Sequence, residues 1–250
     1  MISDPGFYLV AGVAVLMLGL AKGGFTGVGQ VATPIMALLV SPLQAAAILL
    51  PILLVQDIIS VWVYRRTWSA WNIKVMLPGA VVGIGAGWAL AEHLNDSYVR
   101  LALGLVSFFF VLIYWFGVSQ KLAPKPTARS GVVMGVFAGF TSTIAHAGAP
   151  PFQMHVYPQN LDKLTFAGTS AVFFAAMNYI KVVPFLALGQ LTHENVVISA
   201  TLLPLAIATN ILGIWLVRIV PQAMFYRIVY LVMFVISLEL IREGVKGILT

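Results

Sequence analysis

The sequence has no cysteine and very few charged residues. Only 9% of its 250 residues are Asp, Glu, Lys or Arg, whereas a soluble domain carries roughly 25%. So few charges cannot cover the surface of a soluble protein, which excludes a soluble globular enzyme and a disordered chain. The lack of cysteine excludes disulfide bonds, thiolate zinc sites and cysteine nucleophiles.

Apolar residues take the place of the missing charges. They make up 60% of the chain, and the mean hydropathy is +0.98, so we expect the solvent of this chain to be lipid. The net charge of +6 is then typical of basic cytoplasmic loops, and no nucleic-acid partner is expected. Residues 1–6 contain Asp4 and no basic residue, which is unlike a cleaved signal peptide.

The apolar segments predict a bundle of membrane-spanning helices. A helix needs about 20 apolar residues to cross a bilayer. Besides the six uninterrupted segments named below, two apolar stretches, 6–41 and 128–160, are each interrupted by glycine, proline and hydroxyl residues. Interruptions in lipid persist only where they are buried in protein or line a wet cavity. The six uninterrupted segments are 43–64, 72–92, 98–118, 161–189, 193–218 and 222–247.

Basic loop residues orient these segments, because cytoplasmic loops are enriched in Lys and Arg. The loops at 93–96 and 193–194 have almost no basic excess and are expected outside. The first three spans then run opposite to the last three, and the stretch 128–160 must begin and end in the cytoplasm as a hairpin of two short helices or a re-entrant loop. The residues that mark the cytoplasmic side are Arg65, Arg66, Lys74, Lys121, Lys125, Arg129, Arg218 and Arg227.

The two halves also share residues in the same order. Gly24-Phe25-Thr26 recurs as Gly139-Phe140-Thr141, and the mid-span Gln56 has a counterpart in Asn178. With the opposed orientations, this order predicts an inverted repeat. Inverted repeats with paired broken helices are the architecture of secondary transporters, whose substrate binds near the midplane at the breaks.

We therefore predict an all-α integral membrane protein built from two inverted repeats. Each repeat is a broken or re-entrant helical hairpin followed by three transmembrane helices. The first repeat covers residues 1–120 and the second covers residues 131–250. Residues 121–130 form a cytoplasmic linker between them.

Three motifs in the second half carry a resemblance to a known family. They are His146-Ala-Gly-Ala-Pro-Pro151, Phe166-Ala-Gly-Thr-Ser170 and Leu188-Gly-Gln-Leu191. With them, the chain resembles the sulfite exporter TauE/SafE family over nearly its whole length. The resemblance implies a permease for small anions, with sulfite, thiosulfate and organosulfonates such as sulfoacetate as typical substrates.

Three charged residues fall within the apolar segments, where an ionisable side chain is a functional hypothesis by default. Lys22 lies at the first interruption, and Lys181 lies on the same helix face as Asn178, three residues before it. Each ammonium could attract an anionic substrate, or could snorkel to the membrane surface. Asp57 could be the counter-ion of either lysine or a proton carrier.

Neutral polar side chains could donate hydrogen bonds to the anion. The side-chain amides of Gln56 and Asn178 could donate in this way, or they could form hydrogen bonds between helices and hold those helices together. If a half-helix begins at an interruption, its free N–H groups and positive dipole end would face the anion beside the hydroxyl groups. Otherwise those hydroxyls bond their own helix carbonyls. The hydroxyl residues of this class are Thr26, Thr141, Ser142, Thr143, Thr169 and Ser170.

Two histidines follow the second interruption, His146 and His155. Either histidine could sense pH or carry a proton, and His146 is therefore predicted to belong to the substrate-binding residues. The alternative for both is that the ring nitrogens only form hydrogen bonds with the backbone. No carboxylate accompanies them, so no metal site and no cofactor are expected. The residues expected to break the helices are Gly23, Gly24, Gly27, Gly148, Pro150 and Pro151.

These features favour a multi-pass transporter of the bacterial inner membrane, expected to export small sulfur-containing anions by alternating access. An anion-selective channel remains the alternative, as does a carrier of another small anion such as a carboxylate, with or without a coupled proton. Intramembrane enzymes need a nucleophile–base set or a metal cluster, and the sequence offers neither. The sequence is compatible with a monomer or a homodimer.

Overall fold

The computed structural model describes residues 4–23, 25, 27–93, 95–117, 126–216 and 222–249. These residues form helices and their connections, with no strand among them. The α-helices and the two 3-10 helices are, in chain order, α1 (Pro5–Gly23), η1 (Val28–Val31), α2 (Ala32–Ala37), α3 (Pro42–Tyr64), α4 (Ala70–His93), α5 (Asp96–Trp115), α7 (Ala128–Ala145), α8 (Ala149–Val156), η2 (Tyr157–Gln159), α9 (Lys163–Ala187), α10 (His193–Leu216) and α11 (Gln222–Leu249).

Six of these helices are long and apolar enough to cross a membrane, namely α1, α3, α4, α5, α9 and α10. Five of the six coincide with predicted spans, and the sixth predicted span, 222–247, is the long helix α11. The addition is α1, since the stretch 6–41 was expected to form a broken or re-entrant hairpin and not a full span. Its 19 residues give a length of about 28 Å, so this hairpin consists of one long and one short arm. The protein is a multi-pass membrane protein.

Helix starts follow local capping signals. The Ser41 hydroxyl accepts a hydrogen bond from the backbone N–H of Gln44 at the start of α3. Asp162 accepts from Leu164 and Thr165 at the start of α9. Such side-chain acceptors satisfy N–H groups that the first turn of a helix leaves unpaired. Both caps fix where a central helix begins, and so which of its residues reach the middle of the molecule.

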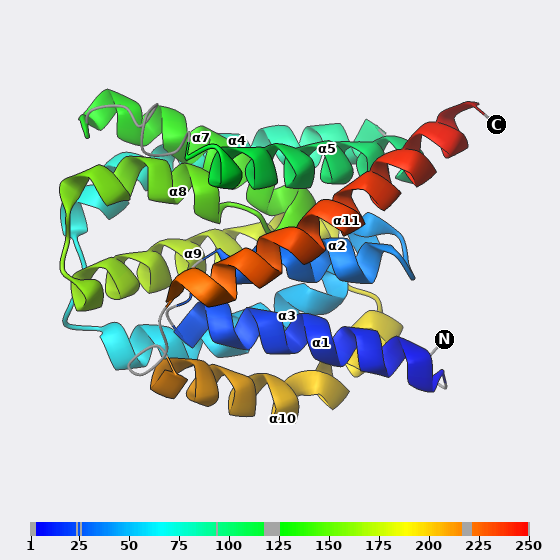
Figure 1. Cartoon of the computed structure of the whole chain (residues 1–250), viewed down its shortest axis with the longest axis horizontal. Helices are drawn as coiled ribbons and strands as arrows, with labels where there is room; N and C mark the ends of the chain where they lie inside the picture. The colour runs from blue at the N-terminus through cyan, green and yellow to red at the C-terminus, as the bar shows by residue number, and fades with distance from the viewer. Residues whose placement is uncertain are drawn as a thin grey trace.

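The two broken stretches enter the bundle from opposite sides (Figure 1). Helix α1 starts on the side that holds both chain ends, and α2 leads back towards that side. Helix α7 starts on the opposite side, and α8 leads back there. The turning points of both hairpins therefore lie inside the bundle, next to the central helices α3 and α9.

Glycines allow two long helix pairs to approach closely. Helix α4 packs along α7, and α1 packs along α10. A Cβ on Gly83 would lie 2.0 Å from the carbonyl oxygen of Val136, and one on Gly23 would lie 2.1 Å from the carbonyl carbon of Gly213. Small residues at such contacts let membrane helices pack backbone to backbone. Each of these pairs joins a helix of the first half to a helix of the second.

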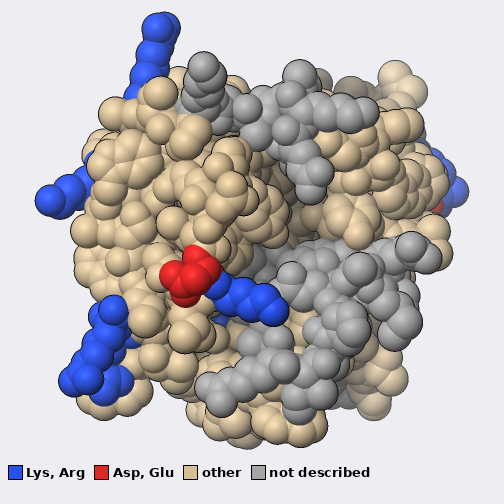
Figure 2. All heavy atoms as spheres, turned by 60° about the vertical axis from the view of Figure 1, so that its left-hand side comes forward, with Lys and Arg blue, Asp and Glu red and all other residues tan. Residues whose placement is uncertain are grey.

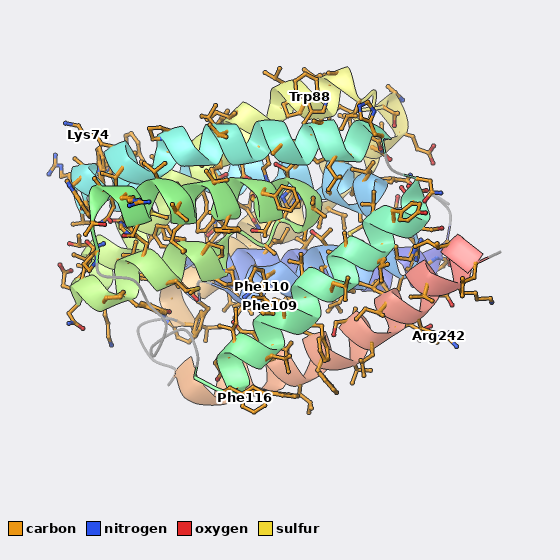
Figure 3. The ribbon with its side chains drawn as sticks, turned by 90° about the horizontal axis from the view of Figure 1, so that it is seen from above. Lys74, Trp88, Phe109, Phe110, Phe116 and Arg242 are labelled. Carbon is orange, nitrogen blue, oxygen red and sulfur yellow. The ribbon has the colours of Figure 1, made fainter. Side chains whose placement is uncertain are left out.

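The outer helices present apolar side chains to the surroundings. On α5, Phe109 points away from the bundle and is 60% exposed, whereas its neighbour Phe110 is buried (Figure 3). Exposed large apolar residues of this kind are expected where lipid is the solvent. The charged residues Lys74 and Arg242 lie at opposite ends of the molecule (Figure 3).

Candidate functional site

A cavity of about 70 Å³, part of it open to solvent, lies at the inner ends of the two hairpins. It extends along the first half of α9, from Asn178 towards Ala167, and so towards the side on which α9 begins. The face on that side is hollowed near its centre and carries separate Lys and Arg side chains around it (Figure 2). The polar residues that line the cavity are Lys22, Gln30, Ser142, His146, Ser170 and Asn178.

One wall of the cavity contains a chain of three polar residues from three helices. The Lys22 ammonium at the end of α1 forms an ion pair with one carboxylate oxygen of Asp57 on α3. Asn178 on α9 donates a hydrogen bond of 2.7 Å to the other oxygen. Asp57 is fully buried, and the Lys22 side chain is 10% exposed. With both oxygens engaged, Asp57 has the contacts of a counter-ion, which supports that alternative over a proton carrier.

The second buried lysine, Lys181, is held by neutral groups. It is fully buried on α9. Its Nζ lies 3.2 Å from the carbonyl oxygen and 3.0 Å from the hydroxyl of Ser142, and 2.7 Å from Nδ1 of His146. No carboxylate among the described residues lies within ion-pair distance of it. Lys181 therefore places a basic side chain directly behind the part of the cavity wall that Ser142 and His146 form.

His146 is fixed on both sides of its ring. It ends α7 in the left-handed backbone region, with φ of 50°. Its Nε2 lies 3.0 Å from the carbonyl oxygen of Ala46 on α3, opposite the Nδ1 contact with Lys181. Left-handed backbone is uncommon for residues other than glycine and asparagine, and it persists where the surroundings over-determine it. The two ring contacts supply that constraint.

The hydroxyl residues of the second interruption end a helix and do not begin a half-helix, so the condition under which free N–H groups would face an anion beside them is not met. Thr141, Ser142 and Thr143 lie in the last turns of α7, where the helix dipole presents its negative end. The Thr141 hydroxyl donates a 2.8 Å hydrogen bond to the carbonyl of Phe137 in its own helix, which is the alternative that the sequence offered for these hydroxyls. The Lys181 Nζ donates a 3.2 Å hydrogen bond to the Ser142 carbonyl at this helix end, which also accepts from the backbone N–H of His146.

The start of α8 also differs from the expected anion cradle. Gly148 is its N-cap, and Pro150 and Pro151 occupy its first turn. Proline has no N–H group, so these two residues begin a helix and remove two of the donors that a helix N-terminus usually offers. Any anion held here must be bound mainly by side chains.

A profile of the sulfite exporter TauE/SafE family matches residues 10–240. The chain belongs to this family. The match covers nearly the whole chain and confirms the resemblance seen in its motifs. No curated protein and no solved structure matches the sequence.

In this TauE/SafE protein, the first interruption lies at a turn between α1 and η1. Gly27 has φ of 106°, a left-handed conformation that favours glycine. Gly23 is the last residue of α1 and lies against Gly213, so its role is close packing. Gly24 and Thr26 lie outside the described residues.

Two predicted site residues of the TauE/SafE protein turn away from the cavity. Gln56 is fully buried and donates 3.0 Å to the carbonyl of Ala206 on α10. The Thr169 hydroxyl accepts from the backbone N–H of Ser69 and donates to the carbonyl of Thr165. Both residues join helices, whereas Ser170 and Asn178 line the cavity.

The predictions missed two residues of the cavity wall. Gln30 on η1 is 2% exposed, and its Nε2 donates 3.1 Å to the hydroxyl of Tyr230 on α11. The Phe174 ring centroid lies 5.8 Å from the Lys22 ammonium, a cation–π contact. Gln30 could have been found as the single amide in the otherwise apolar stretch after the first interruption, whereas nothing in the sequence distinguishes Phe174.

His155 lies outside this site. Its Nδ1 is 3.1 Å from the hydroxyl of Ser130, and its ring stacks on Trp71 at 5.6 Å between centroids. Within the described residues, no three His, Asp or Glu side chains come together as a metal site.

Proposed function

We propose that this TauE/SafE protein exports small sulfur-containing anions, such as sulfite, thiosulfate or organosulfonates, across the bacterial inner membrane. The observation that carries the proposal is the Lys181 amine, which is fully buried among neutral groups immediately behind the cavity wall. A positive charge on this amine is costly there unless it is compensated. An anion in the cavity would provide that compensation and would favour the protonated lysine.

The polar groups around the cavity suit an anion in chemistry as well as in charge. Lys22 and Ser170 line it together with the Ser142 hydroxyl, whose oxygen already accepts from Lys181. Asn178 also lines it while holding Asp57. The one carboxylate near the site is thus tied to a cation and an amide, and it does not repel an anion as a free carboxylate would.

Alternating access is supported by the arrangement of the two halves. The hairpins enter from opposite sides (Figure 1), α1 packs on α10 as α7 packs on α4, and α3 packs on α9 as α5 packs on α11. Exchanging residues 1–120 with 131–250 interchanges the α1–α10 and α4–α7 contacts and maps the α3–α9 and α5–α11 contacts each onto itself. This is the pattern of an inverted repeat with residues 121–130 as linker, in which rocking of one half would open the site to either side.

Export follows from the sign of the substrate. A negative cell interior favours the outward movement of an anion by about 2.3 kcal/mol per charge per 100 mV. No coupled ion is needed for this direction. A channel, the second candidate, would require a continuous polar pore, whereas the polar residues here gather at the two hairpin turns.

The test is anion efflux from proteoliposomes that contain the purified protein. We expect efflux of sulfite and methanesulfonate to fall at least about tenfold in Lys181→Met, because a charge-assisted hydrogen-bond set is lost. Lys163→Met removes an exposed lysine at the start of the same helix and serves as the matched control. Unchanged efflux in a folded Lys181→Met variant would contradict the proposed site. Transport of acetate but of no sulfur anion would contradict the proposed substrates.

A further inference from the structure

We infer that the Lys181 amine takes up a proton when an anion enters the cavity and releases it when the anion leaves, so that each anion crosses the membrane with one proton. The inference rests on the proposed function and adds a coupled ion to it. Three observations carry it: the neutral surroundings of the amine, a hydroxyl that fits both of its protonation states, and the serine that takes its place in the first half.

The first observation is the set of groups around the amine. Lys181 is fully buried, and its hydrogen-bond partners are the neutral carbonyl and hydroxyl of Ser142 and the Nδ1 atom of His146. This Nδ1 is an acceptor, because the other ring nitrogen faces the carbonyl oxygen of Ala46 and so carries the hydrogen. Burial without a counter-ion disfavours the charged form of an amine. The site without an anion therefore favours a neutral Lys181, and an anion in front of it favours the ammonium.

The other charged groups near Lys181 leave this balance unchanged. Lys22 on α1 and Asp57 on α3 lie close enough to act on it electrostatically, but they are paired with each other, so their charges cancel. Helix α4, which also packs along α9, has its charged residues only near its two ends. The charge that decides the state of Lys181 is therefore that of the molecule in the cavity.

The second observation is the Ser142 hydroxyl, which lies 3.0 Å from the Lys181 Nζ and belongs to a residue that lines the cavity. An ammonium has three hydrogens to donate, and it finds three acceptors here. A neutral amine has two hydrogens and a lone pair, and the same hydroxyl can turn to donate its own hydrogen to that lone pair. Both states of Lys181 are thus fully hydrogen-bonded, as a reversible proton site requires.

This hydroxyl also links the proton to the anion. In the neutral state its hydrogen points at the amine. When the amine becomes charged, Ser142 passes this hydrogen to Nζ and takes another from a hydronium ion in the cavity, so that one O–H bond breaks, one N–H bond forms and the solvent loses one proton. The new hydroxyl hydrogen is free to donate to an oxyanion. Proton uptake therefore gives the anion a charge behind the wall and a donor within it.

The third observation is the residue at the equivalent place of the first half. Ser60 on α3 and Lys181 on α9 each lie nineteen residues beyond the N-cap of their own helix. Ser60 donates 3.3 Å to the carbonyl of Lys22 at the end of α1, and Lys181 donates 3.2 Å to the carbonyl of Ser142 in the last turn of α7. A serine is thus sufficient to tie a core helix to a hairpin, and the lysine adds a group that can hold a proton.

The charge that crosses the membrane follows from this coupling. A doubly charged anion such as thiosulfate leaves with its proton as one net negative charge, so the negative cell interior still favours its export. A singly charged sulfonate leaves without net charge, so its direction depends on the pH difference and on its own gradient. Voltage-driven export is therefore expected for dianions.

The test counts the protons that the purified full-length protein takes up when it binds an anion. Methanesulfonate and thiosulfate are the probes, because neither takes up a proton itself near neutral pH. A pH electrode in a weakly buffered solution follows their addition, and isothermal titration gives the amount bound. We expect about half a proton to one proton per bound anion, and an affinity that falls about threefold to tenfold per pH unit between about pH 7 and about pH 8.

Two variants assign the proton to Lys181. Lys181→Met removes the amine, and Lys181→Arg keeps a positive charge that is not released near neutral pH. Both should bind the probes without proton uptake and with an affinity that no longer depends on pH, Lys181→Met more weakly than the wild type. Lys163→Met, which removes an exposed lysine of the same helix, should keep the wild-type count. The wild-type count stands without these variants if they do not fold.

Three results separate the possibilities. Binding of both probes to the wild type without proton uptake would overturn the inference and leave the proposed function in place. Proton uptake that persists in Lys181→Met or Lys181→Arg would overturn it as well, because another group such as His146 or Asp57 would then hold the proton. If methanesulfonate, thiosulfate and sulfite all fail to bind, the proposed function fails and the inference falls with it.

Discussion

Asn178 on α9 donates a 2.7 Å hydrogen bond to the carboxylate of Asp57 on α3, and the two residues occupy equivalent places in their helices. Each lies sixteen residues beyond the N-cap of its own helix, Ser41 for α3 and Asp162 for α9. The contact therefore joins the same position of the two halves across the middle of the molecule. The second half supplies a neutral amide where the first supplies a charge.

The first prediction concerns this contact. Asp57→Asn should lower the free energy of unfolding by about 3–5 kcal/mol, because it leaves the Lys22 ammonium without its counter-ion in a largely buried place. The measurement is thermal unfolding in detergent. The double variant Lys22→Met with Asp57→Asn should recover part of the loss. Glu239→Gln, which removes an exposed partner of Arg242, should cost less than about 1 kcal/mol.

The second prediction concerns the contact of α4 with α7. Gly83→Ala should destabilise the protein by about 1–3 kcal/mol, because its Cβ would lie 2.0 Å from a backbone oxygen of α7. Gly85→Ala, two residues further along α4, meets nothing within 4 Å. It should be neutral or stabilising by up to about 1 kcal/mol, since alanine is the better helix former. Equal melting temperatures of the two variants would contradict this packing.

The third prediction tests the orientation in the membrane. The chain has no cysteine, so single cysteines can be placed on an unmodified background. Pro126→Cys and His193→Cys replace exposed residues that are expected on opposite sides. A membrane-impermeant thiol reagent should label His193→Cys in intact cells and Pro126→Cys only after permeabilisation. The reverse pattern would invert the predicted topology and place the cavity mouth outside.

The fourth prediction concerns pH. Hydrogen bonds from the hydroxyl and the backbone N–H of Thr165 hold the pKa of the exposed Asp162 carboxyl below its usual value. A lowered pKa means that the cap stabilises the folded protein above the unfolded pKa and is lost as pH falls through the folded pKa. Asp162→Asn can still accept the N–H bonds but does not titrate. The wild type should therefore lose more of its melting temperature than Asp162→Asn between about pH 6 and about pH 3.

Helix positions could be predicted from the sequence because lipid imposes a length on each span. The predicted segment 43–64 is α3 to within one residue, and 161–189 contains α9 with two residues to spare at each end. The interruption predicted at 22–27 agrees with the end of α1, but the sequence predicts that the stretch before it is part of a broken hairpin and not a full span. The structure continues that helix through Gly23 against Gly213.

The orientation of side chains around each helix could not be predicted. In a helix that is apolar on all sides, no hydrophobic face indicates which residues point inwards. Gln56 and Asp57 are adjacent in the sequence. The Gln56 amide nevertheless donates a hydrogen bond to the carbonyl of Ala206 on α10, whereas the Asp57 carboxylate accepts one from Asn178 in the cavity wall. The sequence paired Gln56 with Asn178, whereas the structure brings Asp57 to it. Only tertiary packing decides between neighbours of this kind.

The two prolines at the start of α8 have a consequence for how these proteins diversify. A site built from backbone N–H groups keeps its ligand preference whatever side chains surround it. Here Pro150 and Pro151 remove such donors, so in the proposed site recognition would depend on the side chains of residues such as Ser142 and Gln30. If the proposed site is correct, a single codon change at one of these positions would redirect transport from one anion to another while the scaffold stays intact.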